Sequence, residues 1–223
     1  MFLQEEIIED RRPKMAVMAP AREFLLKYFD RAFDCRITPD PAEADFSHAV
    51  LVMGTGYDSS EEMRGFIASC KQHNIKLITL KVPYVIGTGM NGLMLRLARG
   101  IARGFHLKIE GNEARWSVIH ATDVANAALR IVNEELSDKE FIISAPPVRV
   151  GDLQDALSFR IKNKRLGTVK PRWAKIIYGS ELYGLLTTDN IVDTSDFELA
   201  FPDFIFANPA EYLQTHVYDN DSL

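Results

Sequence analysis

"HAVLVMGTGYDSSEEMRGFIASCKQHNIKLITLKV", residues 48–82, is the stretch of sequence that decides the fold. It opens with a continuous apolar run at 48–54, which is typical of a strand buried on both faces of a parallel sheet. Apolar residues then recur at helical spacing between Met63 and Cys70, and a second apolar strand follows from Ile75. Strand, helix and strand in this order predict a right-handed βαβ unit, and with it a parallel sheet covered by helices.

The same alternation continues on both sides of this unit. Short apolar segments predict further strands, and an amphipathic stretch behind Pro20 predicts a helix between the first two of them; the strands are expected at 14–19, 35–38 and 140–144. We therefore expect the α/β class, with a Rossmann-like, doubly wound parallel sheet in residues 1–145. Residues 146–223 are expected to form a smaller C-terminal region.

Short polar motifs predict where the helices begin and end. Ser59 and Glu62 have the spacing of a capping box, and Gly104 suits the C-terminal end of a helix over 91–104. Asp152 and Asn208 each precede or open an amphipathic segment, so both are predicted N-caps. Pro209 suits the first turn of the last helix.

Composition places the chain in the globular class. Its 223 residues are 47% hydrophobic, which is enough for a sizeable core. No apolar run approaches the roughly 20 residues that span a bilayer, and residues 1–12 are too acidic for a secretory signal, so we expect a cytoplasmic protein without a membrane partner. Cys35 and Cys70 are the two cysteines, and neither a disulfide framework nor a zinc site is indicated.

The charge is unevenly distributed. The net charge of −5 argues against nucleic acid as a partner, because general nucleic-acid binders need a dominant basic surface. Residues 160–178, "RIKNKRLGTVKPRWAKIIY", nevertheless contain seven Lys or Arg and no Asp or Glu. This interval suits the phosphate groups of a ligand or partner, and an ordinary solvated basic face is the alternative.

Residues 116–129, "WSVIHATDVANAAL", pass from a buried strand into an amphipathic helix through a polar junction. Three polar side chains lie together there. In the simplest interpretation Thr122 caps the helix, Asp123 complements the helix dipole, and His120 hydrogen-bonds a nearby backbone group.

Four segments in this order carry a resemblance to one family. They are "VPYVIGTG" (82–89), "IHATDVA" (119–125), "EFIISAPPVRVGDLQDAL" (140–157) and "NIVDTSDFELAF" (190–201). Together they resemble the extended short-chain dehydrogenases/reductases, the group of NAD-dependent nucleotide-sugar epimerases and dehydratases. The resemblance implies a Rossmann fold, NAD or NADP as cofactor, a nucleotide sugar as ligand, and 146–223 as the substrate-side subdomain. It also implies that His120 and Asp123 brace the scaffold.

The family's glycine-rich turn after the first strand is missing. Laid on the family pattern, "AVMAPAREFLL" places Pro20, Glu23 and Leu26 at the three glycine positions. Pro20 lacks a backbone donor, Glu23 adds negative charge near a phosphate, and Leu26 adds bulk where helix and strand pack closely. Asp40 has the spacing of the family's ribose-binding acid, and a turn residue is the alternative.

The family's Tyr-x-x-x-Lys pair is missing as well. None of the seven tyrosines has a lysine four residues later. Tyr57 is the candidate by position, but residue 61 is glutamate, and a neighbouring carboxylate raises a tyrosine pKa when a general base needs it lowered. The segment before Val82 is also shorter than in the family, so we expect a contracted cofactor-binding half and doubtful redox catalysis.

Two functions remain open. In the first, the chain binds a nucleotide or nucleotide sugar, with Asn91 after the Gly87-x-Gly89 loop and Arg172 in the basic interval as substrate-binding residues. In the second, it is a non-catalytic partner in a homodimer or with an active paralogue, and the "FELAFPDFIF" segment (197–206) is an exposed apolar patch. Core packing of this aromatic segment is the favoured alternative.

Overall fold

The computed structural model describes residues 14–20, 23–36, 41, 46–55, 60–136 and 138–215. In this part of the chain a five-stranded parallel sheet has the spatial order β2 (Asp34–Arg36), β1 (Lys14–Met18), β3 (His48–Gly54), β4 (Lys76–Val82) and β9 (Glu140–Ile142). The chain moves from β1 to β2 in one direction and then to β3 on the other side of β1. This reversal defines a doubly wound sheet, so the predicted fold class is confirmed.

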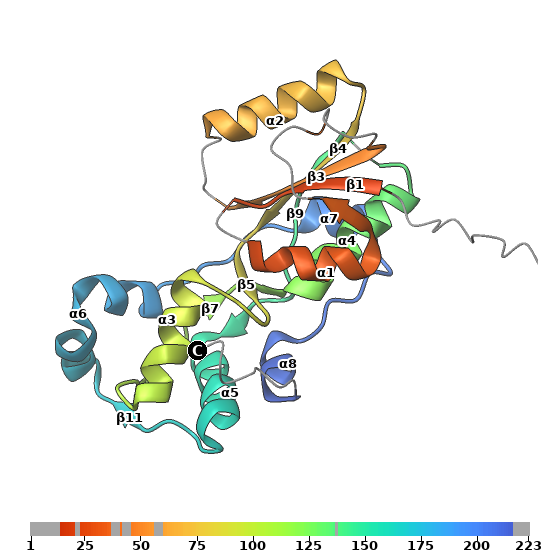
Figure 1. Cartoon of the computed structure of the whole chain (residues 1–223). Helices are drawn as coiled ribbons and strands as arrows, with labels where there is room; N and C mark the ends of the chain where they lie inside the picture. The colour runs from red at the N-terminus through yellow and green to blue at the C-terminus, as the bar shows by residue number, and fades with distance from the viewer. Residues whose placement is uncertain are drawn as a thin grey trace, which may run out of the picture.

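Helices cover both faces of the sheet (Figure 1). α1 (Leu26–Ala32) and α4 (Ala121–Asn133) pack on one face, and α2 (Glu61–Gln72) covers the other. The helix predicted behind Pro20 begins with a short 3-10 turn at Glu23–Leu25. We call the sheet with α1, α2, α4 and α7 (Ser195–Ala200) the sheet half.

Continuous apolar sequence explains the central strands. Every residue of β3 after His48 is buried, because helices cover both faces of this strand. α2 begins after Ser60, whose Oγ accepts a hydrogen bond from the Met63 N–H at 3.2 Å. The predicted cap at Ser59 is therefore wrong by one residue, and Glu62 lies at the second helical position, outside capping-box spacing.

Pro83 ends β4 and redirects the chain. β5 (Tyr84–Ile86) leaves the main sheet and pairs in parallel with β8 (Val118–His120), which runs directly into α4. Proline has no N–H to donate to a sheet ladder, which accounts for the break. The chain thus passes at Pro83 from the sheet to the second part of the molecule.

The second part, which we call the helical half, packs helices around short strand pairs. Its helices are α3 (Gly92–Arg103), α5 (Val150–Lys162), α6 (Pro171–Thr187) and α8 (Pro209–Thr215). β6 (Lys108–Ile109) pairs with β11 (Thr168–Val169), and β7 (Arg115–Trp116) with β10 (Val148–Arg149). The core of this half uses residues from both sides of position 145, and the domain boundary there stays a prediction.

The remaining predicted helix ends have mixed outcomes. Gly104 ends α3 with a left-handed φ of 81°, and Asn208 Oδ1 accepts from the Ala210 N–H at 3.0 Å, so both predictions are confirmed. Asp152 was predicted to cap α5 and does not. The helix begins at Val150, and the Asp152 carboxylate accepts from Arg149 Nε at 3.0 Å within the first turn.

The C-terminal aromatic segment closes over the sheet half. Phe197 and Phe201 are buried, with ring centroids 5.8 and 5.9 Å from that of Phe141 on β9. The packing interpretation of this segment is confirmed for its aromatic residues. Leu199 and Ile205 point outward and stay exposed. No helix in the described ranges has the length and apolar character needed to cross a bilayer.

Candidate functional site

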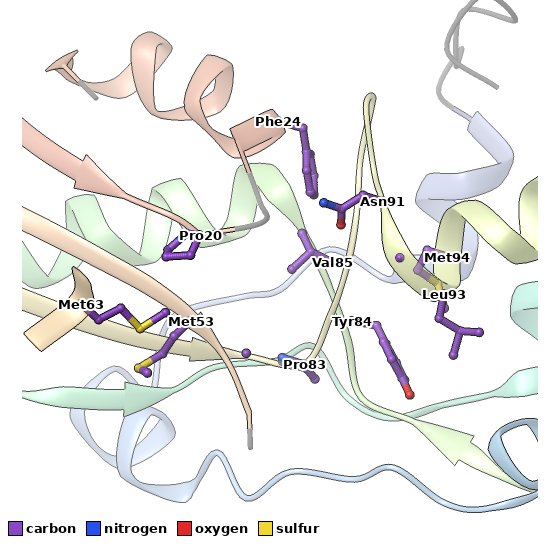
Figure 2. A pocket seen from close by; sticks show the side chains of 12 residues that line it. Pro20, Phe24, Met53, Met63, Pro83, Tyr84, Val85, Asn91, Leu93 and Met94 are labelled. Carbon is purple, nitrogen blue, oxygen red and sulfur yellow. The ribbon is translucent and has the colours of Figure 1, made fainter. Parts of the chain in front are cut away.

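A cavity of about 340 Å³ opens at the carboxyl ends of β1, β3 and β4 (Figure 2). We call it the crevice. Its lining residues lie at or after the ends of these strands, at the start of α3, and in α2, which contributes Met63: Pro20, Phe24, Met53, Gly54, Met63, Pro83, Tyr84, Val85, Asn91, Gly92, Leu93 and Met94. The winding of the sheet reverses between β1 and β3, and open α/β sheets bind ligands outside the carboxyl ends of their strands at such a point.

Two larger hollows lie elsewhere and fit a ligand site less well. One, of about 540 Å³, is at the amino end of β4 and contains Lys71 and Asp138. The other, of about 530 Å³, lies along α5 and α8 and contains Asp152 and Glu211. Neither is at the carboxyl edge of the sheet, so position favours the smaller crevice.

The crevice is apolar with one amide. Met53 and Met63 lie on the side of the sheet half, and Met94 lies opposite them on α3 (Figure 2). Asn91 precedes α3, and Figure 2 shows its amide directed toward the side of the crevice on which Phe24 lies. Methionine and aromatic side chains pack against flat neutral groups, and an amide supplies both a donor and an acceptor.

The described residues do not fit the pyrophosphate of NAD or NADP. Pro20, at the first glycine position of the family pattern, lines the crevice and has no N–H to donate. A 3-10 turn stands where the phosphate-binding helix would begin, and no Lys or Arg is among the lining residues that the structure describes. Leu26 is half-buried at the start of α1.

The loop from Gly87 to Gly89 is fixed against α1. The Thr88 N–H donates to the Tyr28 hydroxyl at 2.8 Å, and a Cβ at Gly87 would stand 2.8 Å from that oxygen. Gly87 has a φ of +153°, which side chains rarely allow. This loop leads into Asn91, so the contact with Tyr28 positions the substrate-side edge of the crevice relative to α1.

The polar junction after β8 is structural. His120 Nδ1 accepts from the Thr122 N–H at 3.1 Å, so His120 caps α4 and the prediction of Thr122 as the cap is wrong. Its ring also packs on those of Tyr28 and Tyr212. The Asp123 carboxylate accepts from the Ala207 N–H at 2.9 Å, and burial raises the pKa of Asp123 above its usual range.

The structure separates the two predicted substrate-binding residues. Asn91 lines the crevice, whereas Arg172 is exposed on the first turn of α6, with its guanidinium 5.5 Å from the centre of the Trp173 ring. A phosphate-binding role for Arg172 stays a prediction. Asp40 and Tyr57 fall outside the described residues, and so does the side chain of Glu23.

Sequence reasoning missed most of the crevice. Phe24, Met53 and Tyr84 were assigned only to a helix face or to strands. One signal was present, because Gly54 and Pro83 mark the carboxyl ends of adjacent parallel strands and residues beside such ends meet at one edge. Met94 belongs to α3 of the helical half, and it reaches the crevice only because the helical half packs against the sheet half.

Comparisons with solved structures agree with this architecture. UDP-N-acetylglucosamine 4-epimerase from Bacillus cereus is similar with a TM-score of 0.59 and 12% identity, over 91% of this chain and 97% of that one. Human epimerase family protein SDR39U1 (isoform 2), solved with NADPH, has a TM-score of 0.57 and 11% identity, over 90% of this chain and 98% of that one. RMD from Pseudomonas aeruginosa, complexed with NADPH, has a TM-score of 0.56 and 11% identity, over 91% of this chain and 95% of that one. No protein-family model and no curated protein sequence matches the chain.

Proposed function

Since this chain has the fold of the extended, epimerase-type short-chain dehydrogenases/reductases, we propose that it binds a nucleotide or nucleotide sugar in the crevice without the redox step. The observation that supports this proposal best is the cavity at the carboxyl edge of the sheet, with Asn91 at its mouth. Two of the similar structures were solved with NADPH. In this chain Pro20, which lines the crevice, has no N–H to donate to a phosphate.

The chemistry of the crevice indicates which part of the ligand it holds. A base or the flat face of a sugar buries apolar surface against Phe24 and the methionines, which is favourable. A pyrophosphate placed there would lose hydration without a positive partner among the described lining residues. We therefore expect the affinity to come mainly from the nucleoside or sugar part of the ligand.

Calorimetric and thermal-shift titrations test the proposal against NAD(H), NADP(H) and a panel of nucleoside-diphosphate sugars. A ligand at about 100 times its dissociation constant stabilises the native state by about 2.7 kcal/mol. Asn91→Ala should weaken binding about fivefold, the effect of losing one hydrogen bond of about 1 kcal/mol. Asn133→Ala, at the exposed end of α4, is the matched control and should change nothing.

Two results would contradict this function. Binding that Arg172→Ala weakens and Asn91→Ala leaves intact would move the ligand from the crevice to α6. Saturable NADH or NADPH binding, with oxidation of the reduced cofactor when a sugar nucleotide is added, would show that redox chemistry survives.

The alternative, a non-catalytic partner in an oligomer, keeps limited support. Burial of Phe197 and Phe201 removes most of the apolar patch on which it was based. Leu199 and Ile205 remain, 81% and 89% exposed. A mass that rises with protein concentration, and that Leu199→Ser returns to the monomer value, would favour this alternative.

A further inference from the structure

An exposed apolar stripe runs along the first segment of α6. Trp173, Ile176 and Ile177 are 51%, 72% and 50% exposed, and their spacing places them on one side of the helix. Ala174 is buried and Tyr178 half-buried on the opposite side. The helix therefore packs against the helical half through its smaller inner face and presents its largest apolar side chains to the outside.

Basic side chains flank the apolar residues along this segment of α6, with Lys175 on the side of the helix away from the stripe. Lys170, Arg172 and Lys175 are all exposed, and they belong to the interval 160–178, which has seven Lys or Arg and no Asp or Glu. The whole chain nevertheless carries a net charge of −5, so its negative charge lies outside this interval. The interval 160–178 is thus basic and apolar together, and the rest of the sequence has a net negative charge.

The fold holds this segment in place. The Tyr178 hydroxyl accepts from the Leu107 N–H at 2.7 Å and donates to the Leu107 carbonyl, and β11, just before α6, pairs with β6. Gly179, with a φ of 72°, ends the segment at a kink. Phe105, 76% exposed, lies two residues before Leu107 and adds an aromatic ring near this anchor. In Figure 1, α6 lies at the left edge of the helical half, apart from α2 and the sheet.

We propose that this surface, made by Trp173, Ile176, Ile177 and the three flanking basic residues, binds the face of an anionic lipid bilayer. Tryptophan and branched apolar side chains favour the headgroup region, and lysine and arginine are attracted to anionic headgroups. The acidic remainder of the chain would be repelled and would face away, which fixes the orientation.

Charge favours a lipid surface over a second copy of the chain. Two copies docked through this stripe about a two-fold axis would bring like basic groups together, which is unfavourable. This proposal departs from the sequence expectation of no membrane partner, which rested on the lack of an apolar run long enough to cross the bilayer. A short helix that lies on the surface buries only one face and does not need the length of a spanning segment.

The test uses the full chain with vesicles of phosphatidylcholine alone and with about one third phosphatidylglycerol. Co-sedimentation should be strong with the anionic vesicles and weak with the neutral ones, and added salt should reduce it. Trp173 reports binding directly, because Trp116, the other tryptophan, is fully buried. Its emission should shift to shorter wavelength on anionic vesicles, and Trp173→Phe should abolish the shift.

Paired variants distinguish binding through this surface from non-specific adsorption to vesicles. Ile176→Ser with Ile177→Ser, and separately Lys170→Glu with Lys175→Glu, should each weaken vesicle binding about tenfold or more. The matched controls, Leu199→Ser with Ile205→Ser and Lys71→Glu with Lys76→Glu, change equally exposed residues elsewhere and should have no effect.

Three outcomes would overturn the proposal. The first is equal binding to neutral and anionic vesicles, and the second is no binding to either. The third is a blue shift that needs no lipid and grows with protein concentration, which would assign the stripe to a second copy of the chain. Nucleotide titration of the same variants is the independent control, because the crevice lies outside α6.

Discussion

The sheet half and the helical half differ in the kind of contact that stabilises each of them internally. In the sheet half, residues 15–19 and residues 49–53 are at most 7% exposed, and they divide between two apolar clusters, one on each face of the sheet. In the helical half, side chains bond to distant backbone groups. The Asn112 amide donates to the Leu186 carbonyl at 2.8 Å, and the Trp116 indole N–H donates to the Thr188 carbonyl at 3.2 Å.

The difference matters because apolar burial has no direction and a hydrogen bond has one. Many apolar residues can fill a buried strand at modest cost. A buried donor that loses its acceptor costs the full desolvation of that group. We therefore expect the sheet half to respond mainly to lost volume, and the helical half to lost partners and to protonation.

The largest effect is expected from Phe197→Ala. Phe197 is fully buried against Phe141 and Phe201, and truncating a buried aromatic side chain costs about 3–5 kcal/mol. Chemical denaturation of both proteins measures the loss. Leu199→Ala, on the exposed side of the same helix, should stay within about 0.5 kcal/mol. Equal losses in the two variants would refute the assigned burial.

The helical half holds the histidine with the larger acid-sensitive shift, while burial also lowers the pKa of His48 on β3. His106 is buried, its Nε2 lies 2.8 Å from the Gln154 amide nitrogen, and burial lowers the pKa of His106 to about 4 from 6.5. The unfolded chain therefore binds a proton at a higher pH than the native chain, so stability is lost as pH falls from 6.5 toward 4. Between pH 7 and pH 5 this loss is about 2 kcal/mol.

Denaturation curves at the two pH values check this sign. His106→Gln should remove that part of the pH dependence, while His73→Gln, in the exposed turn after α2, should retain it. A His106→Gln protein with the full wild-type dependence would place the acid-sensitive group elsewhere.

Asp123 tests the connection from the sheet half to the C-terminal segment. Asp123→Ala leaves the Ala207 N–H without its acceptor and should cost about 1–3 kcal/mol. Asp123→Asn keeps an acceptor oxygen and removes a charge that burial disfavours, so it should cost less than about 1 kcal/mol. If the two variants lose the same stability, the hydrogen bond to Ala207 is not what matters.

The smallest effects concern the helix caps, one in each half. Ser60→Ala at α2 and Asn208→Ala at α8 should each cost about 1 kcal/mol. Thr122→Ala is the contrasting control, because this exposed side chain does not cap α4, and it should stay within about 0.5 kcal/mol. A loss at Thr122 as large as that at Ser60 would restore Thr122 as a cap.

Local signals predicted the strands and covering helices of the main sheet, but they did not predict α6, α7 or the partners of the short strands. The strand at 48–54 was placed with its observed ends, and Asn208 was identified as a cap, because both depend on neighbouring residues. β6 and β7 are neighbours in the sequence, but they pair with β11 and β10, which lie far along the chain. Of the candidate site, Asn91 was found beforehand and its apolar surroundings were not.

The sequence by itself determined the doubly wound sheet, because each strand and helix follows from apolar spacing within a few residues and their order restricts the connections. It also determined that Pro20, Glu23 and Leu26 stand where the family pattern predicts glycines, which is a matter of residue identity. Only the tertiary structure decided that Asn91 and Phe24 line one crevice, and that Trp173 faces outward while Tyr178 is anchored. These outcomes depend on contacts between segments tens of residues apart, and the periodicity within one segment carries no information about them.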